Sequence, residues 1–446
     1  MTDRYDLVLT GGSVVNHDGE GVRDIGIRNG RIAAIGKVGA GRADATLDVA
    51  GLHILPGVID TQVHFREPGA EHKEDLETGS RAAVMGGVTA VFEMPNTKPE
   101  TVDAERLADK VRRATNRMHC DFAFFVGATP NNSDDIPALE QLPGSAGIKV
   151  FRGSSTGDLL VEGGRDLDRL FAKLGRRASF HSENEARLRA RLGLRREGDP
   201  SSHPEWRDPQ AALEATQELV GLAERHGKRI HILHVSTAEE MSYLAHHKDL
   251  VSVEVTPHHL TLGDAADYAR LGTLIQMNPP VRDATHREAI WQAVADGVAD
   301  ILGSDHAPHT LEEKAKTYPN SPSGMAGVQT LVPVMLDQVS RGRLSLARFV
   351  DLTSHGPARL FDLAGKGRIA VGYDADLTIV DVKRRETITN TWIASRCGWT
   401  PYDGLTVTGW PVGTFVRGRQ VMWQGELVTP SQGRAVRFAE AYGAAG

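Results

Sequence analysis

Several residues that can bind a metal stand at the ends of short apolar runs in the middle of the chain. They are His64 after VIDTQV, Lys149 in GIKVF, His181 in ASFHSEN, His234 in RIHILHVS and Asp305 in ILGSDHAPH. Imidazole and carboxylate groups are ligands for zinc and similar divalent ions, and a catalytic metal also keeps an open position for water. One such histidine alone is as easily an ordinary hydrogen-bonded side chain. The five together predict a catalytic metal site.

Lys149 needs a separate explanation because an ammonium group cannot bind a cation. A lysine desolvated at the end of a buried strand readily becomes neutral. A neutral amine reacts with carbon dioxide, and the carbamate that forms is an anionic group able to bridge two metals. N6-carboxylation of Lys149 would therefore make it a ligand, whereas the alternative is a structural lysine paired with Asp305.

Asp305 suits two tasks, coordinating the metal and accepting a proton from a metal-bound water. The alternative is a helix N-cap, for which Pro308 shortly afterwards gives weak support. The histidines elsewhere in the pattern favour catalysis.

The elements that would position these residues are parallel strands. Between about Leu55 and Phe361, apolar runs alternate with helical stretches such as AERLADKVRRA, which indicates strands joined by helices. Eight such strands can be counted, and eight predict a (β/α)8 TIM barrel, where catalytic residues lie at the C-terminal ends of the strands. An open doubly wound sheet is the alternative, but it would spread these residues along an edge. The eight segments are ILPGVIDTQVH, GVTAVFEMPN, CDFAFFVGAT, AGIKVF, ASFHSEN, RIHILHVS, VSVEVTPHH and ADILGSDHAPH.

Both ends of the chain consist of short strands separated by glycine turns, and we expect them to form one small β-sandwich together. The predicted domains are residues 1–54 as the first part of the sandwich, 55–363 as the metal-dependent barrel and 364–446 as the second part.

The composition of the chain narrows the classes of molecule that it could bind. With 446 residues, a formal net charge of −7 and no basic stripe, the chain is not expected to bind nucleic acid or an anionic membrane, which leaves small molecules. No apolar run reaches the length of about 18 residues that a membrane span needs, so we expect a soluble protein. Two cysteines, Cys120 and Cys397, are too few for a disulfide framework and fit a reducing cytoplasm.

A resemblance to a known family rests on segments spread over nearly the whole chain. In order they are IDTQVHFREPG, FEMPNTKP, GIKVF, FHSEN, HILHVST, VTPHHL, MNPPVR, LGSDHAPH and KGRIAVGYDADLTIVD. They closely resemble dihydroorotases and their cyclic amidohydrolase relatives, the hydantoinases and allantoinases. The resemblance implies metal ligands at His64, Lys149 as a carbamate, His181, His234 and Asp305, with Asp305 also the general base.

The resemblance also implies a site for the substrate carboxylate. Dihydroorotases carry an arginine two residues after the second histidine of the first strand, and here that residue is Arg66. Together with Asn96 and His309 it would hold the carboxylate, which a planar guanidinium meets with two hydrogen bonds. The alternative for Arg66 is a salt bridge with Glu67 or Asp75.

Asn278 in MNPPVR resembles a residue near the substrate ring, although it also suits a simple turn. The same holds for Asn96 as a turn residue and for His309 as a loop cap.

The implied reaction is the reversible hydrolysis of (S)-dihydroorotate to N-carbamoyl-L-aspartate, a step of pyrimidine biosynthesis, by metal-bound hydroxide with Asp305 moving the proton. One departure concerns Gln62, which stands where the family usually has the first histidine of His-x-His. An amide oxygen is a weaker ligand than imidazole for a borderline ion, so Gln62 would be a weak ligand or a neighbour of the ligands. We expect one firmly bound Zn²⁺ and a second site that is weak or empty.

Two other functions remain open. A hydantoinase or allantoinase would share the metal ligands without needing Arg66 and Asn96. An inactive scaffold for aspartate transcarbamoylase would explain Gln62, but such a protein usually loses several ligands. By analogy we also expect a homo-oligomer, a dimer or a tetramer.

Two features are open on the sequence alone. The polar segment 310–327 is either a loop over the barrel mouth or an ordinary surface excursion. His258 and His259 lie near the site or on the surface, while His119 and His203 are expected to be solvated.

Overall fold

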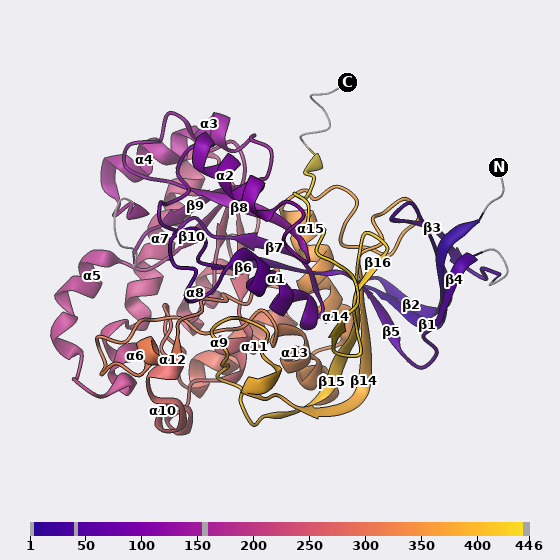
Figure 1. Cartoon of the computed structure of the whole chain (residues 1–446). Helices are drawn as coiled ribbons and strands as arrows, with labels where there is room; N and C mark the ends of the chain where they lie inside the picture. Colours follow the sequence, from indigo (N-terminus) through magenta and orange to yellow (C-terminus); the bar gives the residue numbers. More distant parts are fainter. Residues whose placement is uncertain (1–3, 40–42, 154–158, 440–446) are drawn as a thin grey trace.

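The computed structural model describes residues 4–39, 43–153 and 159–439, and its centre is a sheet of eight parallel strands (Figure 1). Neighbours in the sheet are also neighbours in the chain, which is the order of a barrel and confirms the predicted fold class. The strands are β6 (Val58–Val63), β7 (Val88–Glu93), β8 (Asp121–Gly127), β9 (Ser145–Phe151), β10 (Ala178–His181), β11 (Ile230–Ile232), β12 (Val251–Val255) and β13 (Ile301–Leu302).

The segment after β13 closes the sheet onto β6. Val63 and His306 form a parallel bridge, and the His64 N–H donates to the His306 carbonyl at 2.7 Å. The Ser304 N–H donates to Asp60 Oδ1 at 3.0 Å on the same side. Because the first and last strands are joined in this way, the strand ends form a ring.

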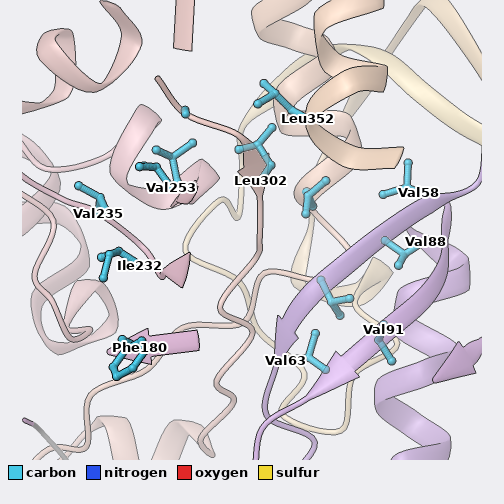
Figure 2. Packing of buried hydrophobic residues seen from close by; sticks show 14 of the residues in the cluster. Val58, Val63, Val88, Val91, Phe180, Ile232, Val235, Val253, Leu302 and Leu352 are labelled. Atoms are coloured by element: carbon cyan, nitrogen blue, oxygen red, sulfur yellow. The ribbon is translucent and has the colours of Figure 1, made fainter. Parts of the chain in front are cut away.

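Alternate side chains of the strands pack on the two sides of the barrel wall. In β8, Phe122 and Phe124 belong to an apolar cluster between the strands and the surrounding helices, called here the outer cluster. Ala123 and Phe125 belong to a separate cluster inside the barrel. Figure 2 shows part of the outer cluster, which runs through residues from six of the strands: Val58, Val63, Val88, Val91, Phe180, Ile232, Val253 and Leu302.

Helices connect the strands and cover the outside of the barrel (Figure 1). The α-helices are α1 (Leu76–Met85), α2 (Ala104–Ala114), α3 (Ile136–Leu139), α4 (Gly164–Lys173), α5 (Glu185–Ala190), α6 (His203–Trp206), α7 (Pro209–His226), α8 (Ala238–Leu244), α9 (Pro257–Thr261), α10 (Ala265–Leu271), α11 (Ala284–Ala295), α12 (Leu311–Lys314), α13 (Leu331–Ser340), α14 (Leu346–Val350) and α15 (Gly356–Leu360). Short 3-10 turns occur at Leu192–Leu194, Pro200–Ser202, Gly272–Ile275 and Asn390–Trp392, and a π-helical turn at Asp351–His355. None of the helices in the described ranges combines the length and the apolar character that crossing a membrane requires.

A second sheet of nine strands combines the two ends of the chain. Its order is β17-β16-β15-β14-β5-β1-β2-β3, with β4 paired to β1, and β14 runs antiparallel to β5 where the two ends meet. β5 ends only two residues before β6 begins, so the chain passes directly into the barrel. The strands are β1 (Tyr5–Asn16), β2 (Gly19–Arg28), β3 (Arg31–Gly36), β4 (Ala43–Asp48), β5 (His53–Pro56), β14 (Leu377–Thr387), β15 (Thr406–Val416), β16 (Arg419–Trp423) and β17 (Glu426–Leu427).

After β17 the chain returns to the N-terminal end of the barrel. Ala435 forms a parallel bridge with Phe122, and the Val436 N–H donates to the Phe122 carbonyl at 2.9 Å. The Phe438 ring lies 6.1 Å from that of Phe92 inside the barrel. Apolar side chains thus fill this end, and the polar strand ends lie at the other.

Candidate active site at the mouth of the barrel

Strand alternation carries Lys149 and His181 into the barrel mouth. Ile148 and Val150 pack in the outer apolar cluster, so Lys149 between them faces inward. His181 follows Phe180 of the same cluster and also faces inward. Both side chains are buried.

Three candidate residues have a left-handed backbone. The φ angle is 65° at Arg66, 38° at His234 and 47° at Asp305, and all three stand just beyond the end of a strand. Such a conformation costs a non-glycine residue on the order of 1–3 kcal/mol and tends to occur at active and ligand sites. The turn redirects side chains that would otherwise follow the strand alternation.

His64 and Asp305 meet where the barrel closes. His64 Nδ1 lies 2.8 Å from Asn96 Oδ1, and because an amide oxygen only accepts, Nδ1 carries the proton. His64 Nε2 lies 3.2 Å from Asp305 Oδ1, and the Gln62 amide Nε2 donates to that oxygen at 3.1 Å. Burial lowers the pKa of His64, while the Asp305 carboxylate opposes this shift. A ring protonated on Nδ1 alone keeps its Nε2 lone pair facing the carboxylate oxygen. Two acceptors at this distance suit a shared cation.

A second pair of ligand atoms is formed by His181 and His234. His181 Nε2 donates to Glu183 Oε2 at 2.8 Å, which leaves the lone pair on Nδ1, and this atom lies 3.1 Å from His234 Nε2. Burial lowers the pKa of both rings. His234 Nδ1 and Gln62 Oε1 are buried polar atoms with no hydrogen-bond partner among the described residues. The chemistry of this donor set fits a divalent metal.

The described His, Cys, Asp and Glu side chains do not by themselves form a group of three or more that could hold a metal ion. They meet in pairs, with His64 Nε2 at 3.2 Å from Asp305 Oδ1 and His181 Nδ1 at 3.1 Å from His234 Nε2. Gln62 contacts the first pair through Asp305.

Lys149 has the properties that carboxylation would require. Its Nζ lies 4.6 Å from the centre of the Phe151 ring and has no hydrogen bond or ion pair with a described residue. Burial lowers the pKa of Lys149 to about 7, although the Asp305 and Glu254 carboxylates oppose this shift. A substantial fraction of the amine is therefore neutral at neutral pH, and the alternative of an ion pair with Asp305 is not observed.

Sequence reasoning missed the group that orients His181. Glu183 is fully buried, and the Arg207 guanidinium forms an ion pair with its carboxylate. Burial favours the protonated form of Glu183, yet Arg207 and His181 outweigh it and hold its pKa well below the usual range. The FHSEN motif contains this glutamate, but its partner Arg207 lies 24 residues away and no local pattern links them.

Arg66 and Asn96 line a cavity of about 460 Å³ together with Lys73 and Glu313. Arg66 Nε donates to the Pro308 carbonyl at 3.1 Å, and its Nη2 lies 3.2 Å from His309 Nε2. Burial lowers the pKa of Arg66 to about 10, so it remains charged at neutral pH. The structure thus brings Arg66, Asn96 and His309 to one side of the mouth.

Lys73 also belongs to this group, although the sequence did not indicate it. Its Nζ donates to His309 Nδ1 at 3.1 Å, which places the ring proton of His309 on Nε2, where the Ser323 carbonyl accepts it at 3.0 Å. The alternative for Arg66, a salt bridge with Glu67 or Asp75, is not observed, and Arg117 and Arg396 pair with these acids instead. Asp305 is not a helix N-cap either, because Thr310 caps α12.

Asn278 lies beside a histidine whose environment was predicted wrongly. His203 was expected to be solvated, yet it is 1% exposed and its Nε2 lies 2.9 Å from Asn278 Oδ1. His119 is likewise buried, against Glu77. His258 is buried and its ring stacks on Tyr402. Periodicity did not reveal these positions because each depends on contacts with residues far along the chain.

The segment 310–327 forms one wall of the mouth. Lys314 is buried and donates to the Gln276 and Gly324 carbonyls at 3.2 and 3.1 Å, and Tyr318 is also buried. The segment carries Glu313 of the 460 Å³ cavity and Ser323 beside His309. Whether it opens as a lid stays a prediction.

A closed (β/α)8 barrel with a ring of histidine, lysine and aspartate at its mouth defines a barrel enzyme with a hydrolytic type of site. Residues 53–421 match the model of the amidohydrolase family, and the chain belongs to that family. This confirms the resemblance seen in the motifs. The amidohydrolase family is generally metal-dependent.

Relatives and solved structures agree with this assignment. The chain is 38% identical over 411 residues to a dihydroorotase of Methanothermobacter thermautotrophicus, covering 91% of this chain and 92% of that protein. It is 38% identical over 420 residues to a dihydroorotase of Halobacterium salinarum, covering 93% and 97%. The L-hydantoinase of Arthrobacter aurescens superimposes with a TM-score of 0.92 at 30% identity, covering 97% of this chain and 99% of that one.

Proposed function

We propose that the protein is a dihydroorotase, which interconverts (S)-dihydroorotate and N-carbamoyl-L-aspartate. The observation that carries the proposal is Arg66, a half-buried cation at the mouth whose guanidinium lies beside His309 and shares a cavity with Asn96. A ring substrate with a carboxylate needs such a group, whereas an uncharged hydantoin does not. The similarity to dihydroorotases over more than nine-tenths of the chain supports the same conclusion.

The residues that would hold the metal are His64, Lys149 as its carbamate, His181, His234 and Asp305. Zn²⁺ suits their nitrogen and oxygen donors. When bound, it supplies Lewis-acid polarisation of a carbonyl and lowers the pKa of water. Gln62 offers only an amide oxygen, so we propose one firmly held Zn²⁺ and a weak or empty second site.

Asp305 is the residue that would move the proton. Its Oδ1 is bound by the Gln62 amide and faces His64, which fixes the carboxylate toward the mouth. In hydrolysis it accepts a proton from the attacking water and delivers it to the ring nitrogen as the amide C–N bond breaks. In ring closure the same group takes the proton from the ureido nitrogen, since both directions pass through the same transition state.

Arg66, Asn96 and His309 would hold the substrate carboxylate and fix the ring in the orientation that attack requires. Asn278, held by His203, is proposed to contact the ring. Glu183 and Arg207 would act through His181 by fixing its protonated nitrogen, as partners of metal-bound histidines commonly do.

Turnover with four substrates tests the proposal. We expect the zinc-loaded protein to hydrolyse dihydroorotate far faster than dihydrouracil, hydantoin or allantoin. A preference for any uncharged ring would contradict it in favour of a hydantoinase or allantoinase. Absence of both bound zinc and turnover would favour a scaffold, and size-exclusion with aspartate transcarbamoylase would then show whether it has that partner.

A further inference from the structure

A strongly basic cavity of about 380 Å³ lies at the end of the barrel opposite the proposed active site. Its walls come from the segments just before β10 and β11 and from the end of α15, all at the N-terminal ends of the strands. Five cationic side chains and one carboxylate line it: Arg176, Arg177, Lys228, Arg229, Arg359 and Asp362. This excess of positive charge occurs in a chain whose formal net charge is −7.

The cations are held in place by groups that do not neutralise them. Arg177 Nη1 donates to the Ile230 carbonyl at 3.0 Å and to Ser252 Oγ at 3.1 Å, and Lys228 Nζ donates to the Leu174 carbonyl at 2.6 Å. These acceptors fix the direction of the side chains and leave their charge uncompensated. Burial together with the charges of Arg229 and Arg359 lowers the pKa of Arg177, while Asp300 and Asp362 oppose this shift.

Two of the cations have no partner within the described part of the chain. Neither Arg229 nor Arg359 forms a hydrogen bond or an ion pair there, and both side chains are exposed at the cavity. The carboxylate of Glu140 lies at the edge of the cavity, where it accepts from the backbone N–H groups of the lining residues Gly175 and Arg176 at 2.9 and 3.0 Å, and it offsets part of the positive charge. Asp300 is paired with Lys248.

A second cavity with several arginines contains more carboxylates in its lining than the cavity at the base of the barrel. The larger cavity of about 640 Å³ beside the second sheet also contains several arginines, but carboxylates lie among them. Lys366 pairs with Asp121 and Asp374, and Arg437 also pairs with Asp374. The lining of that cavity has six cationic and three acidic side chains, several of them paired, whereas the lining of the cavity at the base of the barrel has five cationic side chains and one carboxylate.

We propose that the cavity at the base of the barrel binds a small phosphate-bearing anion. Guanidinium groups from three segments converge there, and a planar guanidinium binds a phosphate through two parallel hydrogen bonds. The volume lies within the range of about 300–1,000 Å³ typical of small-molecule sites. The cavity lies at the N-terminal ends of the strands, so it is distinct from the proposed active site at their C-terminal ends.

Calorimetric titration of the full chain with pyrophosphate at low ionic strength tests this proposal. We expect one saturable site per chain, weakened by about tenfold or more when two of the five cations are reversed in Arg229→Glu/Arg359→Glu. Lys383→Glu/Arg385→Glu changes the net charge by the same amount on β14, at exposed residues away from the cavity, and should leave the affinity unchanged. Thermal unfolding and turnover of both variants check that the fold is intact.

The outcomes separate the ligand classes. Inorganic phosphate should bind at the same site more weakly than pyrophosphate. Citrate carries a similar charge on carboxylates, and citrate binding as tight as that of pyrophosphate would overturn the phosphate assignment. Pyrophosphate binding that is absent, or that persists in Arg229→Glu/Arg359→Glu, would overturn the site itself.

Discussion

Replacing Arg66 with methionine should selectively remove recognition of the substrate carboxylate. Methionine retains much of the length of the arginine side chain and lacks its charge. The guanidinium uses Nε for the Pro308 carbonyl and Nη2 lies 3.2 Å from His309 Nε2, so the Nη1–Nη2 edge is the part of this cavity-lining group that a carboxylate could still bind. Two charge-assisted hydrogen bonds through this edge, at about 1.5 kcal/mol each, amount to about 3 kcal/mol. The expected loss in kcat/KM for dihydroorotate is therefore about 150-fold, mainly through a higher KM.

Dihydrouracil is the matched substrate for this experiment because it is the same ring without the carboxylate. We expect Arg66→Met to change its kcat/KM by less than about threefold. Lys98→Met is the matched variant, because Lys98 lines the same cavity but is exposed, and its side chain forms no hydrogen bond or ion pair with a described residue. It should behave almost as the unmodified protein does with both substrates.

Two results would refute the reasoning. An unchanged KM for dihydroorotate in Arg66→Met would remove the arginine from this role. An equal loss of kcat/KM for both substrates would show that Arg66 supports the fold of the mouth through Pro308 and not the carboxylate, and thermal unfolding would reveal the same defect.

Three further predictions concern the metal ligands and their supports. Gln62→His should raise the zinc content from about one to about two ions per chain in elemental analysis, and an unchanged content would show that Gln62 is not what weakens the second site. Lys149→Ala should lower turnover by about 100-fold or more. The pKa of Lys149 is lowered to about 7, and only the neutral amine reacts with carbon dioxide. Reactivation of the metal-stripped protein by zinc should therefore be faster with added bicarbonate above pH 7 and slow below pH 7. A reactivation rate that depends on neither bicarbonate nor pH would argue against a carbamate. Arg207→Met removes the guanidinium that balances the charge of the buried Glu183 carboxylate and should cost about 3–5 kcal/mol of unfolding free energy in urea titration. The pKa of Glu183 is depressed in the folded protein, so the stabilising effect of its charge is present above its unfolded pKa of about 4.3 and is lost as the pH falls. If the difference in stability between the unmodified protein and Arg207→Met does not shrink in acid, the Glu183 charge is not its cause.

The sequence could predict the barrel and part of the site because both follow from local patterns. Inward placement of Lys149 needs only the apolar neighbours Ile148 and Val150, which are adjacent in the chain. The pairing of Glu183 with Arg207, the burial of His203 and the contact of Lys73 with His309 could not be predicted in the same way. Each joins segments far apart in sequence, and histidine, lysine and arginine are compatible with both solvent and a buried partner. The return of Phe438 to the barrel escaped prediction for the same reason.

The left-handed backbone at Arg66, His234 and Asp305 links the strained geometry to the closure of the barrel. A residue in this conformation persists only where its surroundings fix it, since relaxation would regain on the order of 1–3 kcal/mol. At Asp305 the flanking residues are fixed on both sides, by Ser304 N–H to Asp60 and by the His306 carbonyl to His64 N–H. These bonds are the same ones that join the last strand to the first. Closure of the barrel therefore does more than shape the core, because it holds the proposed proton carrier Asp305, in the segment after β13, against Gln62 and His64 in the β6 segment.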